Sequence, residues 1–128
     1  MKISTLKKKA WKVFSFYIRH RDRGRCFTCG LQKDPREMQA GHFINAAVCG
    51  LPLYFSEINV NCQCYRCNIN LGGYGAEYAK RLEQKYGKEA IEELYRQRDR
   101  YHASPLSPAK QVMFLQEIID RHSVIAVA

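Results

Sequence analysis

Apolar residues at helical spacing mark the N-terminal part of the chain. Six of them recur at intervals that place them on one side of a helix over residues 5–20. They are Leu6, Ala10, Val13, Phe14, Tyr17 and Ile18. The segment Arg23-Gly24-Arg25 interrupts the pattern, so we expect the helix to end before it.

The C-terminal part of the chain predicts three further helices. Residues 75–86 form the first, with Gly87 as its stop, and residues 88–101 form the second. The third begins with Ser107 as its N-cap and Pro108 in its first turn. Its expected buried positions are Val112, Leu115, Ile118 and Ile119.

The middle of the chain lacks helical periodicity and predicts two short strands. Over residues 36–43, alternation places Met38, Ala40 and His42 on one face and Glu37, Gln39 and Gly41 on the other. We expect a loop over 45–52, a second strand over 53–55 and a turn over 57–61. The fold class is therefore α+β, in one domain spanning 1–128. We expect this domain to divide into a basic N-terminal helix (1–25), a core (26–87) and C-terminal helices (88–128).

The formal net charge of +9 favours a polyanionic partner, although a solvated helix face would carry the same residues. Basic residues crowd the N-terminal arm, where Asp22 is the only acid. No apolar run approaches the roughly 20 residues that span a bilayer. Charged residues also interrupt the first apolar stretch, so we expect neither a membrane segment nor a secretory signal.

Two Cys-x-x-Cys pairs, Cys26–Cys29 and Cys64–Cys67, match the ligand spacing of a tetrahedral structural zinc site. The 34 residues between the pairs exceed the compact spacing of roughly 15–20, which leaves room for a hairpin inside the metal clamp. Without a secretory signal, this spacing favours a reducing compartment and a metal over disulfides. Cys49 and Cys62 remain, and we expect them to be small buried apolar residues.

His42 and Asn68 provide candidate chemistry between and beside these pairs. An imidazole with a pKa of about 6.5 can act as a general base at neutral pH. A neutral amide oxygen suits Mg²⁺, which keeps most of its waters and shares phosphate oxygens. Such groups meet the needs of phosphodiester hydrolysis. The other histidines, His20, His102 and His122, are expected at the surface.

These residues resemble a known family. The series His42, Asn59, Cys64-x-x-Cys67 and Asn68 is similar to that of the His-Me finger (HNH-type, ββα-metal) endonucleases. More narrowly, five motifs between about Phe14 and Gly87 resemble the lambdoid phage NinG/Rap recombination endonucleases. They are Tyr17-Ile-Arg-His-Arg-Asp22, Cys26-Phe-Thr-Cys-Gly30, Gln39-Ala-Gly-His-Phe43, Asn59 and Gln63-Cys-Tyr-Arg-Cys-Asn68.

The resemblance implies a fold and residue roles. The core would be a zinc-clamped ββα-metal module flanked by helices. His42 would be the general base, Asn59 would brace its loop, and Asn68 would bind the catalytic Mg²⁺ or Mn²⁺. Many relatives in this class carry an acid or histidine immediately before the base as a second metal ligand, whereas this chain has Gly41. Any of three residues could assist instead: Gln39, Glu37 or Asn45.

The function that the resemblance implies is a metal-dependent, structure-selective endonuclease acting on branched DNA such as Holliday junctions and D-loops. It would work in the cytoplasm of a bacterial host, encoded by a phage or prophage. The alternatives are a non-catalytic zinc-dependent nucleic-acid-binding module and an HNH nuclease without branch selectivity. We expect a homodimer through the last helix and residues 123–128, and the alternative is that this helix simply packs on the core. The expected DNA contacts are Lys7, Lys8, Lys9, Lys12, Arg19, Arg21, Arg23, Arg25, Arg66 and Arg81.

Overall fold

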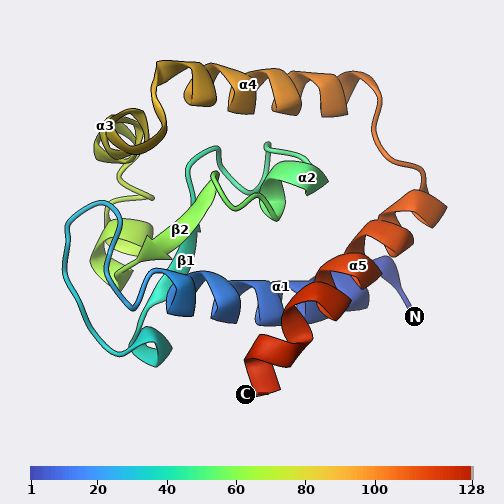
Figure 1. The fold of residues 1–128 in the computed structure, drawn as a ribbon. Helices are drawn as coiled ribbons and strands as arrows, with labels where there is room; N and C mark the ends of the chain where they lie inside the picture. Colours follow the sequence, from blue (N-terminus) through green and yellow to red (C-terminus); the bar gives the residue numbers. More distant parts are fainter. Residues whose placement is uncertain (128) are drawn as a thin grey trace.

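A computed structural model describes the backbone of residues 1–127 and the side chains through Ser123. Helices dominate this part of the chain, and a two-stranded antiparallel sheet lies among them (Figure 1). In chain order the elements are α1 (Ile3–Arg21), the 3₁₀ turn η1 (Pro35–Glu37), β1 (Gln39–His42), α2 (Leu51–Tyr54), β2 (Val60–Gln63), the π-helical turn η2 (Arg66–Asn70), α3 (Gly75–Tyr86), α4 (Lys88–Ala103) and α5 (Pro108–Val127).

The four long helices confirm the predictions from apolar periodicity to within a few residues. Gly87 ends α3 with a φ of 87°, a left-handed conformation that glycine adopts without steric cost. Ser107 precedes α5, and its Oγ accepts a hydrogen bond from the backbone N–H of Lys110 at 3.3 Å. The cap satisfies one of the backbone donors that a helix start leaves unpaired.

The predictions for the two strands were partly wrong. Residues 53–55, expected as a strand, lie in and just after the short helix α2, which begins after Gly50 with Pro52 in its first turn. The second strand is β2, within and beyond the segment expected as a turn. The first strand is also shorter than predicted, because the 3₁₀ turn η1 occupies its expected start. The register pairs Gly41 with Asn61 and His42 with Val60.

The sheet and α2 lie between α1 on one side and α4 on the other, and α5 crosses α1 (Figure 1). One apolar cluster joins α1 and α5 to the sheet and α2. A second packs α3 and α4 against α2 and the loop after β1. Buried members of the first cluster include Phe14, Val60 and Leu115, and those of the second include Tyr78 and Leu94.

The face of α5 toward α1 buries Leu115 and Ile118, as expected, but Val112 is 37% exposed and its predicted burial was wrong. The prediction that His122 lies at the surface was also wrong. The residue is buried, with its ring centroid 4.5 Å from that of Tyr17. The part of the dimer prediction that concerns residues 124–128 lies outside the described side chains. In the part of the chain that the structure describes, no helix combines the length and the apolar character needed to cross a membrane.

Candidate active site and metal centre

The two Cys-x-x-Cys pairs come together at one point. The sulfur atoms of Cys26, Cys29, Cys64 and Cys67 all lie within 4.8 Å of one another, and Cys29 Sγ is 3.7 Å from Cys64 Sγ. Zn–S bonds of about 2.3 Å in a tetrahedron place sulfurs about 3.8 Å apart. The cluster therefore fits a structural metal such as zinc.

Local hydrogen bonds within the two Cys-x-x-Cys segments hold the cysteines of this cluster in position. The N–H of Gly30 donates to the Cys26 carbonyl at 2.9 Å, and the N–H of Cys67 lies 3.5 Å from Cys64 Sγ. Burial opposes ionisation of Cys26, but hydrogen bonds from Thr28 and neighbouring amides outweigh it and lower its pKa to about 6. By contrast, burial raises the pKa of Cys49 to about 11 and that of Cys62 to about 12. Both are fully buried outside the cluster, which confirms their predicted apolar role.

His42 stands at the end of β1, and its ring packs in one cluster with the rings of Trp11 and Tyr54. Its Nε2 lies 3.0 Å from the backbone carbonyl of Tyr54. Because a carbonyl only accepts, Nε2 carries the proton and Nδ1 is the free base. The ring stacks on Trp11 of α1, with centroids 5.0 Å apart and planes 19° apart, and it also contacts the Tyr54 ring at 4.6 Å.

Burial of this ring lowers the pKa of His42 to about 4. The bond to the Tyr54 carbonyl acts in the opposite direction, and the charge of Lys7 lowers the pKa further. At neutral pH the imidazole is therefore unprotonated, the state that a general base requires. The ammonium of Lys7 lies over the Tyr54 ring at 4.1 Å, next to this histidine.

Asn59 is fully buried and braces the chain immediately after His42. Its Oδ1 accepts from the N–H of Ile44 at 2.8 Å, and its Nδ2 donates to the carbonyl of Leu53 at 3.0 Å. Tyr78 of α3 braces the same strand, because its hydroxyl donates to the Gly41 carbonyl at 2.8 Å. The sequence did not single out Tyr78, since a buried tyrosine at helical spacing is indistinguishable from an ordinary core residue.

Asn68 directly follows Cys67, the last cysteine of the second Cys-x-x-Cys pair. Together with His42 it lines a cavity of about 210 Å³. Asn45 and the Gly72-Gly73 turn complete much of its lining. The Asn68 Nδ2 donates to Gln39 Oε1 at 2.7 Å, which leaves the Asn68 oxygen as a candidate metal ligand. A neutral imidazole and an amide oxygen therefore face one cavity, although they lie 26 residues apart in the chain.

The basic residues expected at DNA differ in how the structure uses them. Arg21 donates to the carbonyl of Glu57 at 2.7 Å and to Asn61 Oδ1 at 3.0 Å, and Arg19 donates to the carbonyl of Pro35 at 3.1 Å. These two guanidiniums hold α1 to the rest of the fold. The exposed members of the set are Lys8, Lys9, Lys12, Arg23, Arg25, Arg66 and Arg81.

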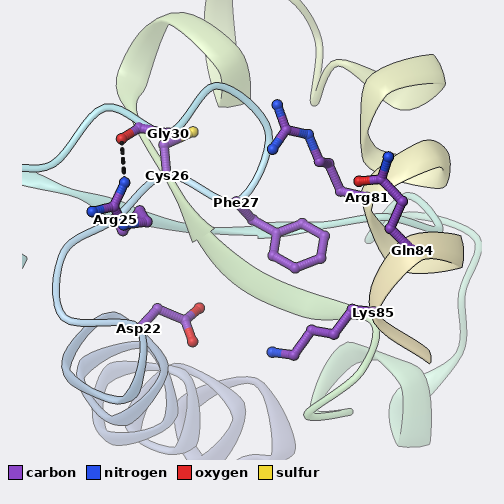
Figure 2. A pocket seen from close by; sticks show the side chains of 8 residues that line it. All are labelled: Asp22, Arg25, Cys26, Phe27, Gly30, Arg81, Gln84 and Lys85. Atoms are coloured by element: carbon purple, nitrogen blue, oxygen red, sulfur yellow. Dashed lines mark hydrogen bonds between the residues drawn. The ribbon is translucent and has the colours of Figure 1, made fainter.

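A second, open hollow of about 440 Å³ lies between the segment of the first Cys-x-x-Cys pair and α3. Figure 2 shows Arg25, Arg81 and Lys85 arranged around Phe27, with Asp22 at one side. Phe27 packs 5.3 Å from the Tyr78 ring, and the Lys85 ammonium lies 5.8 Å from the Phe27 ring. Through Tyr78, this basic hollow adjoins the strand that carries His42.

Comparison with known proteins identifies the family of this chain. Residues 1–113 match the family model described as Bacteriophage Lambda NinG protein. The chain belongs to the NinG family. It is 32% identical over 95 residues to Protein ninG of Escherichia phage lambda and of Escherichia phage 933W, and 30% identical to that of Enterobacteria phage H19B. Each alignment covers 73% of this chain and 46% of the relative, so the chain spans about half the length of these curated relatives. No solved structure matches it.

Removing one zinc ligand from this NinG-family chain should unfold it. We expect Cys67→Ser to lose both bound zinc and cooperative thermal unfolding, because zinc binding in such sites contributes about 10–16 kcal/mol of folding free energy. Metal content measured by atomic emission, together with a thermal melt followed by circular dichroism, checks this. Cys49→Ser is the matched control and should keep its zinc. A Cys67→Ser protein as stable as wild type would refute the structural role of the cluster.

Trp11 should control the titration of His42. Because the folded pKa of about 4 lies below the usual value of about 6.5, the unfolded chain binds the extra proton first, so stability falls as pH drops from 6.5 toward 4. We expect Trp11→Ala to expose the ring and raise its pKa toward 6.5. An NMR titration of the His42 ring from pH 8 to 3 in both proteins measures this. Phe16→Ala, which removes the ring stacked on His20, is the control. An unchanged His42 midpoint in Trp11→Ala would contradict the role of Trp11.

Proposed function

We propose that the chain is a metal-dependent DNA endonuclease of the His-Me finger type. The observation that supports it most is the shared cavity, where the neutral imidazole of His42 and the amide of Asn68 face the same space. The order of β1, β2 and the following helical segment, clamped by four cysteines, agrees with the ββα-metal arrangement expected from the sequence.

In this proposal, His42 activates water for attack on a DNA phosphate. Nδ1 accepts a proton from the water as its oxygen bonds to phosphorus, and the bond from phosphorus to O3′ breaks. The departing O3′ takes up a proton from solvent, and His42 later returns its own proton to solvent. Trp11 and Tyr54 keep the ring oriented, while the Tyr54 carbonyl holds the proton on Nε2.

The residues present also fit a divalent cation. The Asn68 oxygen is a neutral ligand of the type that Mg²⁺ accepts beside water and phosphate oxygens. When bound, such a cation stabilises negative charge on the scissile phosphate and on the leaving oxygen. His42 remains the proton acceptor, and Asn59 holds the following residues in place through Ile44.

The preferred substrate in this proposal is branched DNA of the kind formed in recombination, cut in the cytoplasm of a phage-infected bacterium. This part rests on the resemblance to the NinG/Rap recombination endonucleases. The competing function is a zinc-dependent nucleic-acid-binding module without chemistry. The packing of His42 against the rings of Trp11 and Tyr54 is the observation that favours this alternative, since such packing also suits a purely structural histidine.

The proposed DNA surface has two parts beside the cavity. On α1, Lys8, Lys9 and Lys12 are exposed, and Lys7 lies next to His42. At the second hollow, Arg81 and Lys85 project from α3 beside Phe27 (Figure 2). The homodimer stays a prediction, for which α5 offers Met113 at 71% exposure beside Val112.

Cleavage assays test the nuclease proposal. We expect His42→Ala to slow Mg²⁺-dependent cleavage by about 10²–10⁴-fold, because it removes the general base. DNA binding and zinc content should stay close to wild type. Matched linear, Y-shaped and four-way DNA substrates give the rates. His20→Ala, which removes an exposed imidazole from α1, serves as the control.

The outcomes separate the alternatives. Wild-type rates in His42→Ala would end the assignment of His42 as the base. Tight zinc-dependent DNA binding without cleavage of any substrate would support the non-catalytic module. Equal cleavage of linear and four-way DNA would support an HNH nuclease without branch selectivity.

The salt dependence of DNA binding tests the proposed surface. Each neutralised phosphate changes the slope of log K against log salt by about −0.9 on duplex DNA. We expect replacement of Lys8, Lys9 and Lys12 by Gln to flatten the slope by up to about three such steps, with similar weakening on all sequences. Arg81→Gln combined with Lys85→Gln should flatten it by up to about two. Lys110→Gln, on α5, should leave it unchanged. Wild-type slopes in both combined variants would place the DNA elsewhere.

A further inference from the structure

Gln63, the last residue of β2, contains a buried oxygen atom without a conventional partner. The side chain is fully buried, and its Nε2 donates to Thr28 Oγ1 at 3.1 Å and to the Gly73 carbonyl at 2.9 Å. Its Oε1 has no hydrogen-bond partner among the described residues. An unsatisfied buried acceptor costs about 1–3 kcal/mol, so its retention here calls for a role.

This oxygen faces Gly41, the residue immediately before His42. A Cβ atom built on Gly41 would lie 1.8 Å from Gln63 Oε1 and 2.8 Å from Asn68 Oδ1. The two amide oxygens therefore converge on the space that a side chain at position 41 would fill. The active-site cavity adjoins this space, because Asn68 and Gly73, the residue that holds the Gln63 amide, both line that cavity.

The other candidates for a second oxygen ligand have their oxygens engaged elsewhere or project into solvent. Gln39 Oε1 accepts the Asn68 amide, and Asn45 Oδ1 accepts the N–H of Ala47 at 2.9 Å. Glu37 is exposed in the turn η1, before the strand begins. Gln63 is the remaining candidate with an oxygen directed at the same point as that of Asn68.

We propose that Gln63 Oε1 and Asn68 Oδ1 together form the protein side of the divalent-cation site. This inference rests on the proposed nuclease function. Gln63 from the second strand takes the place of an acidic or histidine ligand before the base, and Gly41 leaves the room for it. Two neutral oxygens leave the charge of the cation uncompensated, so DNA phosphate completes the site and weak binding is expected in its absence.

The zinc cluster sets the orientation of this ligand. Thr28 Oγ1 lies 3.3 Å from Cys26 Sγ and also accepts from Gln63 Nε2. When Cys26 is a metal-bound thiolate, the Thr28 hydroxyl donates its proton to sulfur and can only accept from Gln63. The Gln63 nitrogen must then face Thr28, and its oxygen must face Gly41. Thr28 is thus a positioning residue between the two metal sites.

Binding of Mn²⁺ to the zinc-loaded chain of 128 residues without DNA tests this inference. Electron paramagnetic resonance of free Mn²⁺ during a titration gives the affinity. We expect Gln63→Leu to weaken Mn²⁺ binding at least about tenfold while zinc content stays at one per chain. Asn68→Ala should weaken it similarly. Gln111→Leu, the same substitution on α5, is the matched control, because the Gln111 amide bonds the Leu106 carbonyl away from this cavity, and its Mn²⁺ affinity should match wild type.

Gly41→Ala provides a second variant should Gln63→Leu fail to fold. It keeps every hydrogen-bonding group but displaces the Gln63 oxygen, so Mn²⁺ affinity should again fall at least about tenfold. Wild-type Mn²⁺ affinity in Gln63→Leu or Gly41→Ala, with a loss in Asn68→Ala, would overturn the role of Gln63 and leave the proposed nuclease intact. Absence of both Mn²⁺ binding and cleavage in the wild type would overturn the proposed function and this inference together.

Discussion

The convergence of four cysteine sulfurs is the constraint on which the rest of the site depends. It joins two segments that the chain separates by 35 positions, between Cys29 and Cys64, and it does so in a domain with a modest apolar core. A metal contribution of about 10–16 kcal/mol is comparable to the whole stability of a typical domain, about 5–15 kcal/mol. The sheet, the Gly72-Gly73 turn and the start of α3 are therefore arranged around this point.

A second physical theme is the dry environment of His42. Packing against Trp11 and Tyr54 keeps the ring neutral and lowers its basicity, and the Tyr54 carbonyl fixes its tautomer. A base with a low pKa is always in the correct protonation state, yet it accepts a proton less readily. In the proposed reaction, a DNA phosphate near the ring would raise the pKa of His42, because a nearby negative charge favours the protonated imidazole. At neutral pH the His42 ring is thus unprotonated and able to accept a proton, but it is a weak base.

The long helices could be predicted because their apolar periodicity persists for several turns and ends at recognisable caps, such as Ser107 and Gly87. The strands could not be placed as well. All four residues of β2 are buried, so the alternation that identifies a half-exposed strand is missing. The helix α2 has only four residues, too few for a period to be read. Pairing with β1 decided the structure of β2, and burial of Leu51 and Leu53 in the two apolar clusters accompanies α2.

The candidate site shows the same division between local and tertiary information. His42 and Asn68 could be selected because their side chains and their positions between and beside the cysteine pairs indicate chemistry, and Asn59 was selected through the family resemblance. Gln63 and Trp11 could not, since an amide and an indole acquire these roles only through what lies opposite them in space. The charge pattern likewise did not separate Arg21, which bonds internally, from its exposed neighbours.

The packing of α1 against α5 has a consequence for how the protein is made. The helix that carries Trp11 is synthesised well before α5, which covers its apolar side through Leu115 and Ile118. At about 5–20 residues per second, roughly 4–20 s pass between the end of α1 and the start of α5. During that time the apolar cluster against which Trp11 packs lacks the residues that α5 supplies. This cluster is completed only when α1 and α5 meet, so a partly translated chain carries the residues of the site without this packing beside them.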